Sequence, residues 1–179
     1  KQRLDAEVMR DAMLAVSGEL DLSPRPGSLV AELSSQSVSL VAFNQAVPSD
    51  LDGSRHRSSY LPVMRDRLPD VLRLFEFAEP SLVTGQRHIT NVPPQALYHM
   101  NSEFVRARAE ALARRVKADA SSRDERISRA YELCFHRSPD DEASDLITNF
   151  FDSSELSEDE AWIAFCQSLL ASADFRIAD

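Results

Sequence analysis

The segment from Thr84 to Leu97 gathers side chains that could bind a polar ligand. It contains a guanidinium, an imidazole, hydroxyls and amides, and it leads into Pro93 and Pro94, which suit the first turn of a helix. Free N–H groups and the helix dipole at such a start favour an anion or another polar ligand. The alternative to ligand binding, which the sequence favours, is a structural loop whose side chains form hydrogen bonds with buried backbone groups. The candidate residues of this segment are Arg87, His88, Thr90 and Gln95.

A second group of candidates lies outside that segment and comprises Arg10, Asp11, Tyr60 and Asn101. Arg3, Glu7 and Arg10 share one polar face of the first predicted helix. We expect the side chains of this ladder of ion pairs to be exposed to solvent. Each exposed pair contributes roughly 0.3 kcal/mol to stability. If the face instead packs against the rest of the fold, Arg10 and Asp11 would form a buried network that must be fully paired.

No catalytic or cofactor motif accompanies these candidates. The sequence contains no GxSxG, GxGxxG, Walker or HExxH pattern and no evident nucleophile–base pair, so catalysis would rest on His88 or on residues from elsewhere in the chain. No carboxylate stands at ligand spacing beside the histidines, and we therefore expect neither a metal nor another cofactor in this segment. Cys134 and Cys166 are expected to be reduced core residues, although adjacent helices could also place them for a disulfide.

Helical periodicity predicts the elements that position these residues. Apolar side chains from Leu4 to Leu20 predict an amphipathic helix, which Ser23 to Gly27 would end with two prolines and a glycine. A short helix is predicted after Pro69, another from Pro93 to Met100, and a long one from Asn101 or Ser102 to about Ala118. The predicted starts of the last three helices are Ser122, Ser138 and Ser157, the first and third of which match the capping box.

These elements predict a mainly α fold. We expect an irregular multi-helix domain with a C-terminal three-helix acidic segment and at most a small β element near residues 28–63. Residues 1–120 would form a helical region with a loop-rich insertion and the candidate site, and residues 121–179 would pack on it as part of one domain. The core residues predicted for the last three helices are Ile127, Ala130, Tyr131, Cys134, Leu146, Ile147, Phe150, Trp162, Phe165, Cys166, Leu169 and Leu170.

The net charge argues against two classes of partner. The 179 residues carry a formal charge of −9, and the whole acidic excess falls within residues 121–179. An acidic chain lacks the counterion release that drives binding to nucleic acid, and anionic membrane surfaces repel it. We therefore expect no nucleic-acid partner, and the lack of a long apolar run argues against membrane insertion.

Several separated motifs resemble one family, the planctomycete-type domain of unknown function 1553. The resemblance runs in order over nearly the whole chain, through the segments Arg3–Glu7, Arg57–Val63, Leu74–Phe77, Thr90–Leu97, Asn101–Val105, Arg129–Pro139 and Ala161–Phe175. The resemblance implies the C-terminal region of large exported proteins, often with a c-type cytochrome module upstream, and hence an extracytoplasmic location. It implies no established activity. Glu76 stands where the family commonly has an Asp, and no haem motif lies in this segment.

Two hypotheses for function follow. The leading one is a noncatalytic interaction or scaffold module of a larger exported protein, whose partners are other domains of the same parent chain and possibly a protein or a glycan. The competing one is a hydrolytic, polysaccharide-processing enzyme portion, with a pocket completed by an upstream domain. The second requires Arg10, Asp11, Arg87 and Asn101 to line one concave pocket, whereas separate exposed positions or a fully paired buried network would favour the first.

Overall fold

The computed structural model describes residues 2–24, 53–61, 63, 68–78, 83, 85–87, 90 and 92–178, and it confirms a mainly α protein. Seven α-helices lie within these residues. They are α1 (Ala6–Val16), α3 (Asp70–Leu74), α4 (Pro93–Asn101), α5 (Glu103–Asp119), α6 (Arg123–Phe135), α7 (Asp141–Ser153) and α8 (Glu158–Ala171). Two short 3-10 turns, η2 (Ser58–Tyr60) and η3 (Asp174–Arg176), and two short strands, β1 (Gln2–Arg3) and β2 (Ile177–Ala178), complete the described elements.

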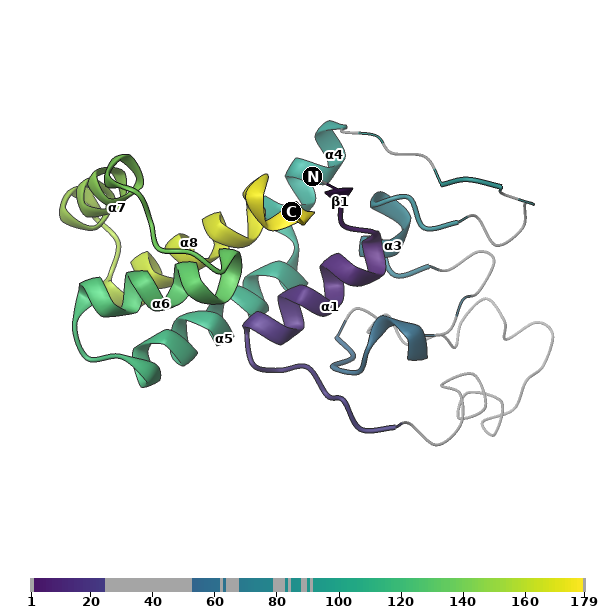
Figure 1. Cartoon of the computed structure of the whole chain (residues 1–179), viewed down its shortest axis with the longest axis horizontal. Coiled ribbons are helices and arrows are strands. Elements are labelled where there is room, and N and C mark those ends of the chain that lie inside the picture. Colours follow the sequence, from purple (N-terminus) through teal and green to yellow (C-terminus); the bar gives the residue numbers. More distant parts are fainter. Residues whose placement is uncertain are drawn as a thin grey trace.

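Helix α5 is the centre of the core. It packs most extensively along α8, and α6, α4 and α1 surround it (Figure 1). Its fully buried face consists of Val105, Ala109, Leu112 and Val116, which is the periodicity that the sequence predicted. No described helix has both the length and the apolar character needed to cross a membrane.

The β structure lies elsewhere than predicted. Strands β1 and β2 pair antiparallel, with Gln2 opposite Ala178, so the two ends of the described chain lie side by side (Figure 1). In the region where a β element was expected, residues 28–52 lie outside the described residues, and residues 53–61 contribute only a single bridge from His56 to Asp21. A two-residue strand has no periodicity, and therefore the sequence offered no signal for the pair at the ends.

Helix α1 is shorter than the predicted span of residues 4–20. It ends at Val16, and Gly18 follows in the left-handed region with φ of 76°. Arg115 Nη1 donates to the carbonyl oxygens of Ala15, at 3.0 Å, and Val16, at 2.8 Å. The prediction was wrong because it assigned termination to the distant prolines and not to a glycine with a supporting cation.

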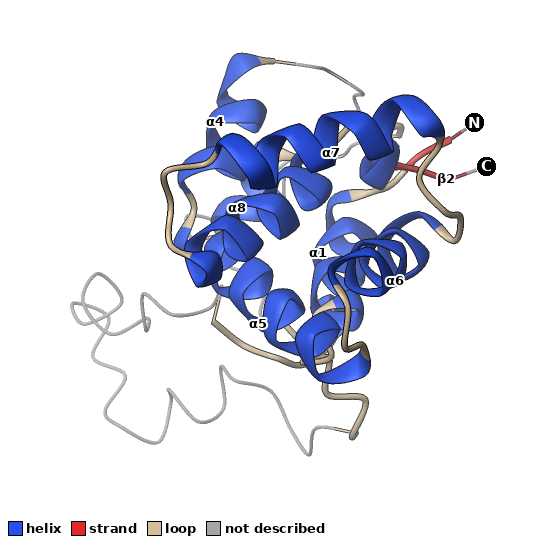
Figure 2. Ribbon diagram, turned by 90° about the vertical axis from the view of Figure 1, so that its left-hand side faces the viewer, coloured by secondary structure: helices blue, strands red, loops and turns tan. Residues whose placement is uncertain are grey.

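The C-terminal helices begin largely as predicted. Ser122 and Ser157 each form a complete capping box, with Glu125 and Glu160 as partners. Helix α7 begins two residues later than its predicted start, because Asp140 and not Ser138 caps it. The predicted core stripe fails at one position, since Leu146 is 64% exposed on α7, which lies on the outside of the bundle (Figure 2).

Both cysteines are free thiols in the structure. Cys166 is fully buried and Cys134 is half-buried, and burial raises the pKa of the Cys134 thiol to about 12. A thiol held in its neutral form packs as a small apolar side chain, in agreement with the predicted role.

Candidate functional site

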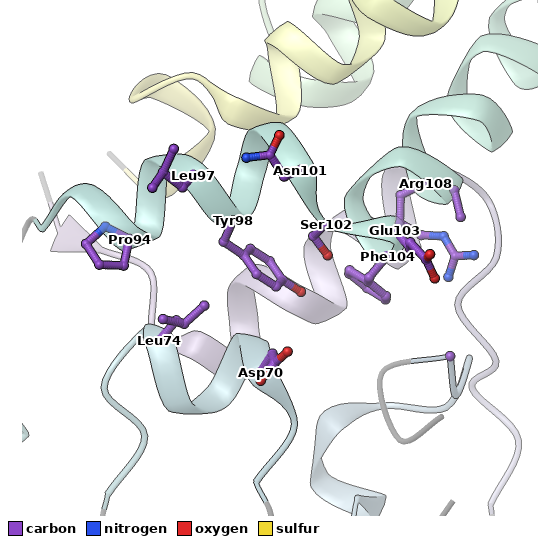
Figure 3. Close-up of a pocket in the computed structure, with 12 residues that line it drawn as sticks. Asp70, Leu74, Pro94, Leu97, Tyr98, Asn101, Ser102, Glu103, Phe104 and Arg108 are labelled. Carbon is purple, nitrogen blue, oxygen red and sulfur yellow. The ribbon is translucent and has the colours of Figure 1, made fainter. Parts of the chain in front are cut away.

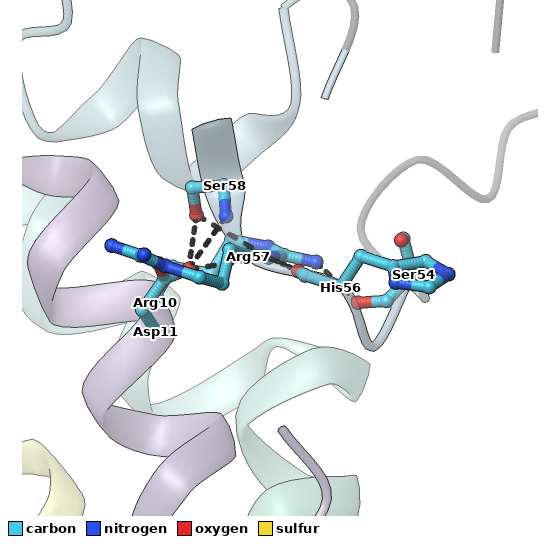
Figure 4. A network of polar contacts seen from close by, with 6 residues as sticks. All are labelled: Arg10, Asp11, Ser54, His56, Arg57 and Ser58. Atoms are coloured by element: carbon cyan, nitrogen blue, oxygen red, sulfur yellow. Dashed lines mark hydrogen bonds and ion pairs between the residues drawn. The ribbon is translucent and has the colours of Figure 1, made fainter. Parts of the chain in front are cut away.

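Arg10 and Asp11 form one buried polar network with the segment from Ser54 to Ser58 (Figure 4). Arg10 is 0% exposed and donates from Nη1 to the His56 carbonyl oxygen at 3.0 Å and to Ser58 Oγ at 3.3 Å. Its Nη2 donates to the Ser54 carbonyl oxygen. Asp11 Oδ1 accepts from both the backbone N–H and the hydroxyl of Ser58, each at 2.7 Å. This network fixes the segment onto α1.

The expected exposed ladder on α1 is therefore wrong at Arg10. The segment before η2 covers this face of the helix, and a guanidinium that loses water there needs protein acceptors. The Asp11 carboxylate compensates the charge of Arg10, whose Nη1 lies 3.7 Å from Asp11 Oδ1. The Nε of Arg57 lies 3.7 Å from Oδ2 of the same carboxylate. Tyr60, another candidate, is 36% exposed, and its ring meets the edge of the His56 ring at 6.4 Å.

Arg87 belongs to a second, separate cluster on α1. Its Nη1 and Nη2 each donate to one oxygen of Glu7 at 2.8 Å, and its guanidinium lies 5.1 Å from the centroid of the Phe77 ring. The hydrogen bonds from Glu7 raise the pKa of Arg87. A bidentate pair of this kind fixes the orientation of both side chains. Arg87 thus joins its loop to the helix.

Thr90 and Gln95 lie in a third cluster. Glu76, which has φ of 66°, accepts from the Thr90 N–H at 2.8 Å and from the Thr90 hydroxyl. Arg3 donates to the Thr90 carbonyl oxygen and, at 2.9 Å, to Gln95 Oε1, and buried Gln95 donates to the Leu74 carbonyl oxygen at 2.9 Å. Glu76 was not among the candidates, and its difference from the family's usual Asp was the signal that pointed to it. His88 lies outside the described residues.

Asn101 is the candidate that lines a pocket (Figure 3). This pocket has a volume of about 730 Å³ and lies between α3, α4 and the first turns of α5. Arg10, Asp11 and Arg87 do not line it. The structure therefore does not bring the four residues of the hydrolase hypothesis together in this pocket.

Arg108 lines the same pocket, and the sequence analysis missed it. It is 7% exposed, and its Nε lies 2.8 Å from Glu19 Oε2, in an ion pair. Burial lowers the pKa of Arg108, and the charge of Glu19 opposes that shift. The ring of Phe104 lies 5.2 Å from the Arg108 guanidinium and 5.5 Å from that of Arg10. The available signal was an arginine placed within the apolar face of α5, beside Val105.

His99 is a second buried group that the sequence did not single out. It is 1% exposed, and neither ring nitrogen has a hydrogen-bond partner among the described residues. Burial lowers the pKa of His99 to about 4, and the charges of Arg176 and Arg3 add to the shift. The imidazole is therefore neutral at pH 7. No group of three or more His, Cys, Asp or Glu side chains within the described part of the chain could hold a metal ion.

The fold and the clusters define a mainly α module in which polar side chains join loops to helices. The family model PSD1, described as a protein of unknown function (DUF1553), matches residues 1–151, and the chain belongs to this family. No curated protein and no solved structure matches the chain. The match ends within α7, whereas α8, which follows it, forms the core together with α5.

Proposed function

We propose that this chain is a noncatalytic interaction or scaffold module of a larger exported protein. The observation that carries the proposal is the fully buried Arg10, whose guanidinium donates to the Ser54 and His56 carbonyl oxygens and to the Ser58 hydroxyl. A catalytic group must face a substrate, whereas these atoms face the protein's own backbone. Arg10 therefore has a structural role, because it holds the segment from Ser54 to Ser58 against α1.

The pairing of Arg87 supports the same function. Both terminal nitrogens of its guanidinium donate to Glu7, and Oδ1 of Asp11 accepts from both the N–H and the hydroxyl of Ser58. Three of the four residues that the hydrolase hypothesis requires thus make hydrogen bonds within the fold. Asn101 lines the pocket between α3, α4 and α5, and the other three residues do not line it. The hydrolase alternative is for this reason the less supported of the two.

The proposed partners are other domains of the same parent chain, and a protein or glycan partner is the second possibility that we carry. Exposed apolar side chains on α4 support a contact surface there, since Leu97 is 55% exposed and Met100 is 67% exposed. The extracytoplasmic location that we propose rests on the family resemblance described above. Nucleic acid is not a proposed partner because the chain is acidic, and a membrane interior is not proposed because the sequence has no long apolar run.

An experiment on the full-length parent protein separates the two functions. Arg87→Ala is compared with Arg73→Ala, an exposed arginine of α3 that pairs only with its neighbour Asp70 in the described structure. We expect Arg87→Ala to lower the melting temperature and to leave unchanged any polysaccharide hydrolysis of the parent, per folded molecule. Loss of turnover in Arg87→Ala with the fold intact would instead establish the enzyme function.

The scaffold function has a direct test of its own. A photo-activatable cross-linker is placed at Met100 in the full-length parent, and the cross-linked peptides are identified by mass spectrometry. Cross-links from α4 to another domain of the parent are expected. A parent protein that yields none, neither within the chain nor to an added glycan or protein, contradicts the proposal.

A further inference from the structure

The outer face of α4 is apolar and carries no charge. Its exposed side chains include Pro93, Ala96, Leu97 and Met100, and Leu97 and Met100 are 55% and 67% exposed. These four residues, the outer strip of α4, follow the i, i+3, i+4, i+7 spacing of one helix face. No Asp, Glu, Lys or Arg occurs from Ile89 to Ser102, although 27% of the residues of the chain are charged. At the edge of the molecule, α4 thus presents an uncharged apolar strip (Figure 1).

The opposite face of α4 is fixed to the rest of the fold. Gln95 and His99 are fully buried there, and Gln95 Nε2 donates to the Leu74 carbonyl oxygen at 2.9 Å. At the end of the helix, Gln167 Nε2 of α8 donates to the carbonyl oxygens of His99, at 3.0 Å, and Met100, at 2.9 Å. The helix is therefore held near both ends, and its outer strip needs little ordering to meet a partner.

The outer strip differs from the other large exposed apolar side chain of a helix, Leu146 of α7. Leu146 is 64% exposed, but Asp145 precedes it and Glu142 lies one helical turn away, and both carboxylates are exposed. A single exposed leucine between charged groups is ordinary on a protein surface. A row of exposed apolar side chains without neighbouring charges is instead typical of a contact surface.

The lack of charge restricts what can cover the outer strip. A charged side chain buried against it would lose water without gaining an ion pair. Pro93, Ala96 and Leu97 also have no side-chain donor or acceptor for the hydroxyl groups of a glycan. Apolar side chains on the facing surface would remove apolar area from water on both sides. Helices with anchors at this spacing are recognised by apolar grooves.

The size of the outer strip favours a partner within the same chain. Helix α4 has 9 residues, and at 1.5 Å per residue it is only about 13 Å long. Stable complexes between separate proteins bury about 800 Å² on each partner, which four side chains of so short a helix do not provide. A domain of the same chain is already held nearby, and its high effective concentration allows a small contact to persist.

We propose that the outer strip of α4 inserts into an uncharged apolar groove on another domain of the parent chain. The proposal rests on the proposed scaffold function and names the surface that such a module would contact. Pro93, Ala96, Leu97 and Met100 are the anchors, and the hydrogen bonds of Gln95 and Gln167 hold the helix in place.

The test uses the full-length parent with a photo-activatable cross-linker at Met100. We expect cross-links to another domain, with a yield that stays within about threefold between about 0.1 and 1 M NaCl, because salt screens ion pairs and does not weaken apolar contacts. A larger fall at high salt indicates a charged partner surface and overturns the proposal. Cross-links only to a second copy of the parent or to an added glycan also overturn it.

Substitutions one helical turn from the cross-linker test the exclusion of charge. Ala96→Glu is expected to lower the cross-linking yield at least about tenfold, whereas Ala96→Gln, which has the same size without the charge, stays within about threefold. Leu146→Glu on α7 is the control and should leave the yield unchanged. Both Ala96 and Leu146 are exposed, so the fold should persist, and the melting temperature checks this. Equal yields in Ala96→Glu and Ala96→Gln contradict an uncharged groove.

The outcomes separate this proposal from the scaffold function. Cross-links to another domain that are lost at high salt, or that Ala96→Glu does not affect, leave the scaffold function standing and overturn the apolar groove. A parent protein without any cross-link contradicts both. The salt dependence requires no substitution beyond the cross-linker, and it therefore decides the question even if a variant at Ala96 fails to fold.

Discussion

Single buried polar residues determine how the loops of this protein attach to its helices. Arg10 is fully buried, and it donates to acceptors on residues 54, 56 and 58, far from it in sequence. Burying such a group is unfavourable by itself, so the network is best understood as specifying one position for the segment and not as adding net stability. Removing one partner, by contrast, leaves the others buried and unpaired.

Arg10→Ala is therefore expected to lower the free energy of unfolding by about 3 kcal/mol. The control is Arg73→Ala, whose exposed pair with Asp70 should contribute under about 0.5 kcal/mol. Urea denaturation followed by circular dichroism measures both. A loss below about 1 kcal/mol in Arg10→Ala would mean that water readily replaces the arginine in this network.

His99 predicts a dependence of stability on pH. Its pKa in the folded protein is about 4, below the usual histidine pKa of 6.5, so the unfolded chain takes up the proton first as the pH falls. The contribution of neutral His99 is complete above pH 6.5 and is lost as the pH falls toward 4, by about 2 kcal/mol between pH 7 and pH 5.

His99→Leu should remove that part of the pH dependence of the free energy of unfolding. Urea denaturation at pH 7 and pH 5 measures it. Other groups titrate in both proteins, so the difference between wild type and variant isolates His99. If both proteins lose the same stability between these two pH values, the imidazole is not held neutral by burial.

At the scale of elements, helix ends are specified by local chemistry, but different residues do so in different helices. Capping boxes start α6 and α8, as the sequence predicted from Ser122 and Ser157. The end of α1 instead depends on the left-handed Gly18 and on a cation from α5, Arg115. The glycine is visible in the sequence, whereas its partner is 97 positions away and has no local signature.

Gly18→Ala is expected to lower the free energy of unfolding by about 1 kcal/mol, because an alanine at φ of 76° is strained. Gly85→Ala is the matched control, since a Cβ there would meet nothing within 4 Å. Thermal unfolding of both variants gives the comparison. A Gly18→Ala protein as stable as the Gly85→Ala protein would show that the end of α1 tolerates other backbone angles.

At the scale of the whole molecule, the two ends of the chain build one core. Helix α8 contributes the buried side chains Trp162, Phe165, Cys166 and Leu170, and it packs along α5 more extensively than any other described pair of elements. Strand β2 pairs with β1. The final helix is thus integral to the packing, although the family match ends at residue 151.

A chain of residues 1–151 is accordingly expected to lack cooperative unfolding, because its long central helix would expose the apolar face that α8 covers. Thermal unfolding by circular dichroism, together with the dispersion of amide signals in NMR spectra, tests this against the 179-residue chain. A shortened chain with a sharp transition and dispersed signals would contradict a single core, and it would locate a domain boundary near the end of α7.

The sequence by itself determined the helical class, the starts of α4, α5, α6 and α8 and most of the apolar faces, because periodicity and capping act within a few residues. It also placed Arg10, Asp11 and Arg87 among the candidates. Only the tertiary structure decided what they do, since the partners of Arg10 and Arg87 lie about 50 to 80 residues away and burial depends on which segment covers α1. Pairings across such separations leave no local pattern, and so the buried network, the Arg108 pocket and the β1–β2 pair emerged only with the fold.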